Sequence, residues 1–237
     1  MISNPSAPQR VHFLLAALLA LFVLYPLLGE HQLGAVILDV FVAGSLLLTV
    51  RALKGSGKRV FGTAATFSGL AIAAAVGSHI GGVAALLPIG HVFGFLFFLL
   101  TGVTLMRRVL LPGPVTASRI CAAVCAYLLI GLGWGLVYSL MEHVKPGAFL
   151  DSTGSAHAGH AVLAGYPHLT YYSFTTLTTL GFGDVVPATP LARSLSTLEA
   201  VGGQLYLALL VARLVGLQSA RLAAAELSGP PSEAPNA

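Results

Sequence analysis

The chain has 237 residues, of which 56% are hydrophobic and 8% are charged, and its formal net charge at pH 7 is +4. A soluble domain carries about a quarter charged residues, so this composition excludes a protein whose surface is covered by polar groups. Apolar runs of about 20 residues cross the hydrocarbon core of a bilayer as helices. The composition therefore predicts a polytopic, all-α membrane protein.

Six apolar runs are predicted to span the membrane as helices. No small-residue cleavage site follows the first run, so a retained helix is favoured over a secretory signal. The second run carries an acidic residue, Asp39. The predicted spans cover residues 11–28, 33–53, 60–77, 92–106, 118–140 and 188–227.

The basic residues indicate how these spans are oriented. All of them except Lys145 and Arg193 fall on one side of the predicted bundle or at its edge. The positive-inside rule therefore predicts a multi-pass protein of the plasma (inner) membrane with both termini in the cytoplasm. This orientation explains the net positive charge, so the lipid bilayer is an expected partner and nucleic acid is not.

The segment between the fifth and sixth spans is too short and too polar to cross the bilayer. Pro167 stands where a helix would begin, and residues 168–178 have room for about three helical turns. Gly181 and Gly183 then break regular helix. A short helix followed by irregular backbone at membrane depth predicts a re-entrant loop, which is tolerated only where it is buried in protein or lines a watery path.

The residue types of this loop suit the passage of a dehydrated cation. Successive backbone carbonyls can replace the water shell of the ion, and carbonyls that point the same way require alternating left- and right-handed backbone. Gly181 and Gly183 allow the left-handed conformation at little steric cost. The Thr179 hydroxyl adds an oxygen at the inner end, and Asp184 places a carboxylate at the outer mouth.

Residues 178–184, Thr-Thr-Leu-Gly-Phe-Gly-Asp, resemble the T-x-G-Y-G-D signature of potassium channels in the pore-loop cation channel family. Tyr171-Tyr172 is similar to the aromatic pair of the pore helix in that family, and Gly203 falls where its inner-helix hinge is expected. The resemblance implies a homotetrameric pore that binds K⁺ in a selectivity filter between the last two spans, with no other cofactor. It assigns K⁺ binding to Thr179, Leu180, Gly181, Phe182 and Gly183, the outer mouth to Asp184, and pore-helix support to Tyr171, Tyr172, Thr175 and Thr178.

Three positions depart from the commonest pattern. Leu180 replaces valine or isoleucine, and its larger side chain is expected to pack behind the filter. Phe182 replaces tyrosine and so loses a hydroxyl that can tie the filter to its surroundings. Thr175 stands where some relatives have a glutamate, so we expect no carboxylate to brace the filter.

The last helix is predicted to carry two further features. Gly202 and Gly203 lie about halfway along it, and they are either a gating hinge or a site of close helix packing. Glu199 is an intramembrane carboxylate, which is costly unless it is paired or wet. Its expected partners are Thr175, Thr176 or Gln204.

Three domains follow from these elements: a four-helix membrane domain over residues 1–112, a pore domain over 113–227 and a short disordered tail over 228–237. A voltage sensor needs Arg or Lys at every third position of the fourth span. Residues 93–106 contain neither, and Arg107 and Arg108 only follow them. The first domain is therefore expected to lack gating charges.

Other functions remain open at this point. A non-selective monovalent cation channel is the nearest alternative, because Leu180 and Phe182 both depart from the commonest filter. The sequence Gly181-x-Gly183-Asp184 also matches the G-x-G-D motif of intramembrane aspartyl proteases, which need a second membrane aspartate. Asp39 lacks the tyrosine that precedes this partner in those enzymes, so the protein is not expected to be an enzyme. A transporter built from inverted repeats is disfavoured, because the chain has no second half like the pore loop.

Overall fold

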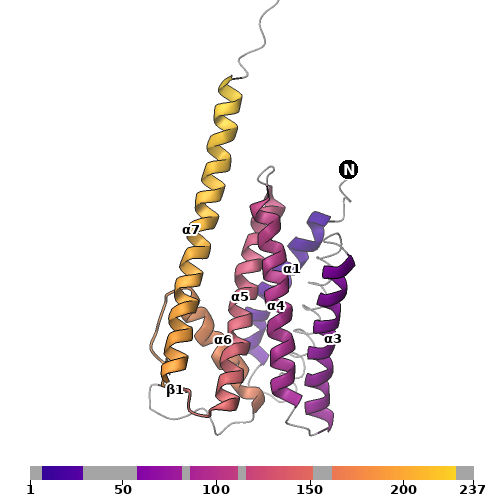
Figure 1. Ribbon diagram of the computed structural model, residues 1–237, viewed down its shortest axis with the longest axis vertical. Helices are drawn as coiled ribbons and strands as arrows, with labels where there is room; N and C mark the ends of the chain where they lie inside the picture. The colour runs from indigo at the N-terminus through magenta and orange to yellow at the C-terminus, as the bar shows by residue number, and fades with distance from the viewer. Residues whose placement is uncertain (1–6, 29–57, 82–85, 112–115, 152–161, 228–237) are drawn as a thin grey trace, which may run out of the picture.

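The computed structural model describes residues 7–28, 58–81, 86–111, 116–151 and 162–227 (Figure 1). Most of them are helical. The helices are α1 (Ala7–Leu28), α3 (Lys58–Gly81), α4 (Leu86–Leu110), α5 (Ala117–Val144), α6 (Val162–Leu177) and α7 (Pro190–Leu227).

Four of these helices are long and apolar enough to cross a membrane. They are Lys58–Ser78 within α3, Leu86–Leu110 of α4, Ala117–Val144 of α5 and Pro190–Ser219 within α7. Helix α1 covers the predicted first span, 11–28, and its apolar stretch within the fully described residues is Val11–Ala20. The predicted second span, 33–53 with Asp39, lies outside the described residues. Among the described residues, four of the six predicted spans therefore correspond to helices of spanning length.

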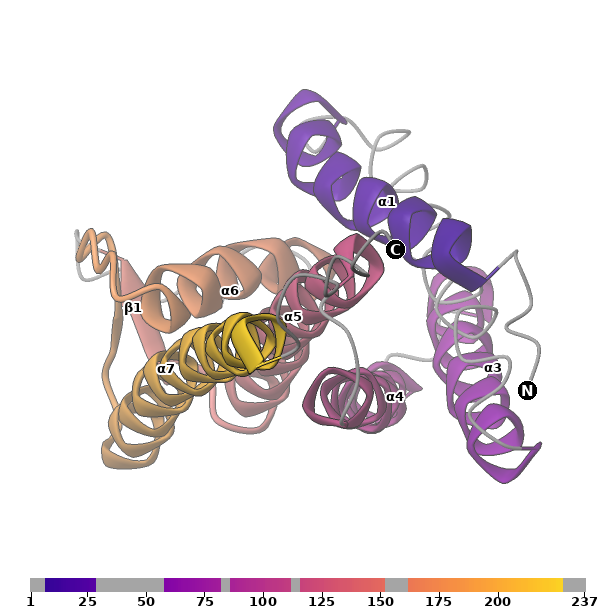
Figure 2. The ribbon, with the colours of Figure 1, turned by 90° about the horizontal axis from the view of Figure 1, so that it is seen from above.

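Helix α5 lies at the centre of the arrangement, against α1, α4, α6 and α7, while α3 packs on the far side of α4 (Figure 2). Buried side chains from α1, α4 and α5, including Leu14, Phe97 and Leu129, form most of the core, to which α3 adds Ala64 and α7 adds Tyr206. In a membrane such helices are held by close packing rather than by the exclusion of water.

Glycines on α5 bring α6 close to it. A Cβ atom at Gly131 would lie 2.5 Å from the ring of Phe174, and one at Gly135 would lie 2.6 Å from the Thr170 hydroxyl. A side chain at either position would push the two helices apart. The short helix is thus seated in a groove that glycine creates.

Helix α6 begins at Val162, earlier than predicted, and Pro167 lies inside it rather than at its start. Proline at the sixth helical position removes one backbone hydrogen bond, which costs less near a helix start than in its middle. The helix ends at Leu177, close to the predicted end.

A two-stranded antiparallel sheet was not predicted. Strand β1 (Phe149–Asp151) follows α5 and pairs with β2 (Val185–Pro187), which follows residues 178–184. The register pairs Phe149 with Pro187, and Asp151 with Val185. The sheet fixes the end of the 178–184 segment to the end of α5.

Helix α7 is much longer than its neighbours. Its 38 residues correspond to about 57 Å, and its C-terminal part extends beyond the ends of the other helices (Figure 1). Pro190 occupies its first position, and the Ala192 amide donates to the Thr189 hydroxyl at 3.3 Å. Proline and a threonine cap are both typical of a helix start.

Candidate functional site

The backbone of residues 178–184 alternates in handedness. Thr179, Gly181 and Gly183 have positive φ angles of 59°, 57° and 78°. The two glycines match the prediction, whereas Thr179 was not expected to share this conformation. A β-branched residue in the left-handed region is rare. The segment therefore has the alternation that a row of like-pointing carbonyls requires.

The direction of the carbonyls follows from the amide hydrogen bonds. The Leu180 and Gly181 amides both donate to the Thr175 carbonyl at the end of α6, at 2.8 and 3.2 Å. In a planar trans peptide the carbonyl points opposite to the amide of the next residue. The carbonyls of Thr179 and Leu180 therefore point away from α6, toward the open side of the segment.

The side chains of this segment are not covered by the chain itself. Leu180 is 58% exposed and Phe182 is 66% exposed. The single chain leaves most of the Leu180 side chain uncovered, so its packing behind the filter stays a prediction for an assembly of several copies. Both side chains are left free to contact another molecule.

Asp184 is held from two sides. The Tyr171 hydroxyl donates to its Oδ2 at 2.7 Å, and the Val185 amide donates to its Oδ1 at 3.0 Å. The hydrogen bond to Asp184 is the main reason that the pKa of Tyr171 is raised. The carboxylate is thus fixed at the end of the segment and remains exposed.

Tyr172, the neighbour of Tyr171, is buried against other helices. Its hydroxyl donates to Ser196 Oγ on α7 at 2.6 Å, and its ring lies 5.3 Å from the ring of Tyr138 and 5.1 Å from that of Phe149. Edge-to-face aromatic contacts of this kind stabilise beyond the area they bury. Tyr172 therefore ties α6 to both α5 and α7.

The two predicted supporting threonines, Thr175 in α6 and Thr178 just after it, act mainly through local bonds. Thr175 is buried, and its hydroxyl donates to the Tyr172 carbonyl of its own helix at 2.9 Å. The Thr178 hydroxyl donates to the Phe174 carbonyl at 2.6 Å. The contribution of Thr175 to the site is its backbone carbonyl, which receives the two amides described above.

The inner-helix glycines differ in their surroundings. A Cβ at Gly203 would lie 2.6 Å from the carbonyl oxygen of Leu177, the last residue of α6. That carbonyl also accepts from the Tyr127 hydroxyl at 3.2 Å. At Gly202 nothing lies within 4 Å of such an atom. Close helix packing thus accounts for Gly203, while no contact of the described residues accounts for Gly202.

Glu199 is buried, with 1% of its surface exposed, but its partners are not the predicted ones. The Tyr138 hydroxyl of α5 donates to its Oε2 at 2.5 Å, and Ser173 Oγ of α6 lies 2.5 Å from its Oε1. Ser173 lies on the same helix face as Thr176, one turn nearer the start of α6. Position 175 carries no carboxylate, and the carboxylate that contacts α6 is that of Glu199 on α7.

Comparison with known families bears on this region. Residues 127–217 match a family model described as "Ion channel". The matched span starts within α5 and includes α6, the 178–184 segment and most of α7. No curated protein matches the chain. The match and the four apolar helices together support ion-channel activity in a membrane.

Glu142, which the sequence did not single out, and Arg193, which it placed apart from most of the basic residues, hold the backbone at strands β1 and β2. The Glu142 carboxylate accepts from the amides of Gly147 and Phe149, at 2.6 and 3.0 Å. The Arg193 Nε donates to the Pro187 carbonyl at 3.1 Å. An acidic residue at a helix end just before a Pro-Gly turn is the signal that would have pointed to Glu142.

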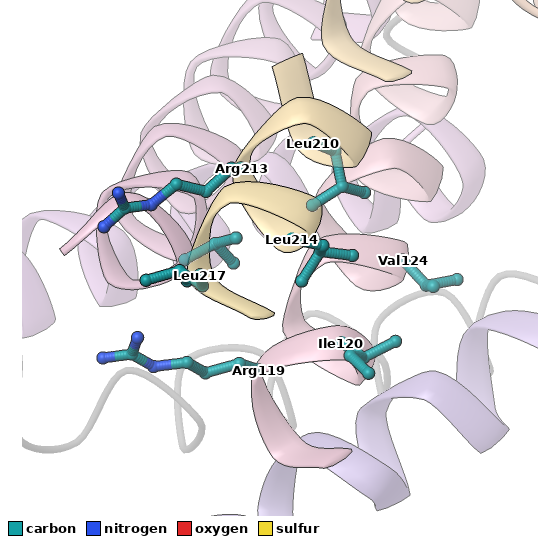
Figure 3. A pocket seen from close by; sticks show the side chains of 9 residues that line it. Arg119, Ile120, Val124, Leu210, Arg213, Leu214 and Leu217 are labelled. Carbon is teal, nitrogen blue, oxygen red and sulfur yellow. The ribbon is translucent and has the colours of Figure 1, made fainter. Parts of the chain in front are cut away.

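A small cavity lies at the other end of α5, near the start of that helix. It holds about 30 Å³ and is lined mainly by aliphatic side chains of α5 and α7, with Arg119 and Arg213 beside it (Figure 3). These arginines also donate to the carbonyls of Leu111 and Leu110, at 3.1 and 3.0 Å. The cavity shares no lining residue with the 178–184 segment.

Proposed function

We propose that this chain is one subunit of a homotetrameric, potassium-selective channel of the plasma membrane, with both termini in the cytoplasm. The alternating backbone of residues 178–184 is the observation that carries the proposal. With the amides of Leu180 and Gly181 bonded to the Thr175 carbonyl, the carbonyls of Thr179 and Leu180 face the open side of the segment. Four such segments around one axis would present rings of carbonyl oxygens to an ion.

K⁺ is the cargo that these oxygens fit. We assign its binding to the backbone of Thr179 to Gly183 and to the Thr179 hydroxyl. Asp184 adds one carboxylate per subunit at the outer mouth, where it attracts cations toward the entrance. Backbone carbonyls carry no net charge, so an ion enters without being trapped by a fixed anion.

Four copies are required because one segment cannot surround a pore. Only 11% of the apolar stretch of α7 is buried within the chain, against 56% of that of α5. Leu198, Val201 and Leu205, which share a face of α7, are all exposed, as are Leu180 and Phe182. A closed ring is the usual assembly for identical subunits, and it would cover these residues.

The remaining parts of the chain take supporting roles in this proposal. Residues 113–227 form the pore domain, in which Tyr171, Tyr172, Thr175 and Thr178 hold the filter, and residues 1–112 form a membrane domain without gating charges. Residues 228–237 are a tail that takes no part in conduction.

The test is potassium flux from liposomes that contain the purified protein. Gly181→Ala should abolish most of the flux, because its φ of 57° is strained for any residue with a Cβ. Gly69→Ala is the matched control, since Gly69 lies within α3 and a Cβ there meets nothing within 4 Å. Equal flux from both variants would reject the filter assignment.

A non-selective monovalent cation channel is the second candidate, and the exposed Phe182, which has no hydroxyl to anchor the filter, is the observation that favours it. A bi-ionic reversal potential, with potassium on one side and sodium on the other, separates the two. We expect a clear preference for potassium. A reversal potential near zero would replace the main proposal with this one.

A further inference from the structure

The polar cluster around Glu199 joins three helices behind the candidate filter. Glu199 comes from α7, Tyr138 from α5 and Ser173 from α6, and each of the three side chains is buried within the chain. Ser173 Oγ also lies 2.8 Å from the Gly131 carbonyl of α5. Because these groups are already covered in one subunit, the cluster forms without a contribution from a neighbouring copy.

Both short contacts of Ser173 can be hydrogen bonds at the same time when Glu199 is neutral. Ser173 has a single hydroxyl proton, yet its oxygen is within bonding distance of two acceptors, the Gly131 carbonyl and Glu199 Oε1. Both contacts are hydrogen bonds if Ser173 donates to Gly131 and Glu199, as a carboxylic acid, donates to Ser173. Oε2 then accepts from Tyr138, and every polar atom of the cluster is satisfied.

A neutral acid also fits the surroundings. No hydrogen bond or ion pair among the residues that the structure describes brings Lys, Arg or His to Glu199. A buried charge without a partner costs several kcal/mol. Charged side chains are accordingly rare within membranes. The protonated form avoids this cost and retains both contacts.

The cluster is placed where it can control the filter. Ser173 lies two residues before Thr175, whose carbonyl holds the amides of Leu180 and Gly181. One turn earlier along α7 than Glu199, Ser196 accepts from Tyr172. A change in the position of α7 is thus transmitted to α6 by two adjacent hydrogen bonds. The Leu180 and Gly181 amides move with α6, because they are bonded to its Thr175 carbonyl.

We propose that Glu199 is a positioning residue that, as a neutral carboxylic acid, couples the inner helix to the pore helix and so sets the geometry of the filter. The inference rests on the proposed channel function. It assigns to α7 the bracing carboxyl group that Thr175 does not supply.

Substitutions of each residue in the network test this coupling through ion selectivity. A loss of folded protein alone would not change the selectivity. Glu199→Gln keeps a donor for Ser173 and an acceptor for Tyr138, so its K⁺/Na⁺ permeability ratio should equal that of the wild type. Glu199→Leu, Tyr138→Phe and Ser173→Ala each remove part of the network and should lower the ratio by about fivefold or more, the effect of one lost hydrogen bond. The ratio is read from bi-ionic reversal potentials.

Matched controls remove hydroxyls that do not reach Glu199. Tyr206 is a buried tyrosine of α7 whose hydroxyl donates to the Ala123 carbonyl, and Ser194 bonds only within α7. Tyr206→Phe and Ser194→Ala should leave the ratio unchanged. Tyr138→Phe combined with Glu199→Leu should add little to Glu199→Leu alone, because both changes break the same contact.

The wild-type measurement separates the two levels of inference. If the wild type shows no potassium preference, the proposed function fails first. If the wild type is selective and Glu199→Leu, Tyr138→Phe and Ser173→Ala all keep its ratio, the channel stands and the coupling is overturned. A Glu199→Gln variant as poorly selective as Glu199→Leu would overturn the neutral state. If Glu199→Leu does not assemble, the permeability ratios of Tyr138→Phe and Ser173→Ala still test the coupling.

Discussion

Thr179 adopts a backbone conformation that its side chain opposes. The left-handed region costs about 1–2 kcal/mol for a residue with a Cβ, and threonine is β-branched. The cost is offset locally, because the Thr179 amide donates to the Thr176 carbonyl at 3.0 Å and its hydroxyl donates to the Thr178 carbonyl at 2.6 Å. Strain held in this way is typical of functional segments. The pattern of glycines predicted two of the three left-handed residues, but nothing local to Thr179 marked the third.

The two glycines of α7 should respond in opposite ways to alanine. Gly203→Ala places a Cβ 2.6 Å from the Leu177 carbonyl, and such overpacking costs typically about 1–3 kcal/mol. Gly202→Ala meets no atom and gains up to about 1 kcal/mol of helix propensity. Thermal unfolding of the purified protein measures both. Equal destabilisation by the two changes would favour a hinge over close packing.

Tyr171→Phe should change the pH dependence of stability. The hydrogen bond to Asp184 raises the pKa of Tyr171 above its ordinary value of 10. A raised pKa means that the stabilisation is fully present below pH 10 and is lost as the pH rises through the folded-state value. The wild type should therefore unfold at a higher temperature than Tyr171→Phe between pH 7 and about pH 10, and the difference should shrink above that. A constant difference up to pH 11 would contradict the assignment.

At the scale of elements, the sequence predicted the long helices better than the short segments. Apolar runs locate α3, α4, α5 and α7 because bilayer thickness sets a length that composition alone reveals. Strands β1 and β2 are three residues each, too short for any periodic pattern, and their pairing joins residues far apart in the chain. The partners of Glu199 were missed by one helical turn, since the relative height of two helices depends on packing. Burial of Leu180 was predicted from a family that assembles, whereas one chain leaves it open.

The turn between α5 and β1 should depend on Glu142. Its carboxylate accepts from the amides of Gly147 and Phe149, and hydrogen bonds to a charged group are worth about 1.5–3 kcal/mol. Glu142→Leu should speed hydrogen exchange of these two amides and of the β1–β2 pairs, and lower the unfolding temperature. Glu142→Gln keeps one acceptor oxygen and should be intermediate. Unchanged exchange in Glu142→Leu would show that the sheet holds the turn by itself.

At the scale of the whole molecule, comparison with known families supports an ion-channel assignment for one part of the chain and not for the other. The ion-channel match covers residues 127–217 and leaves α1, α3 and α4 outside it. Among the described residues, α1 and α4 pack against α5 and α3 packs against α4, and the Phe22 ring of α1 also lies 4.7 Å from the Phe174 ring of α6. A role for these helices in sensing voltage depends on their charge.

The channel should open with little dependence on voltage. Steep gating needs three to four charges per subunit that cross the field, each worth about 2.3 kcal/mol per 100 mV. In α4 the basic residues are Arg107 and Arg108, both in the last turn, where the field has already fallen. Most of α4 can therefore move without carrying charge across the bilayer. Single-channel recordings in planar bilayers should show an open probability that changes shallowly between −100 and +100 mV, a range over which three charges would shift the equilibrium by more than about 10 kcal/mol. Displacement currents, or a sigmoidal and steep voltage curve, would mean that charged residues beyond α4 cross the field and that the first domain is a sensor.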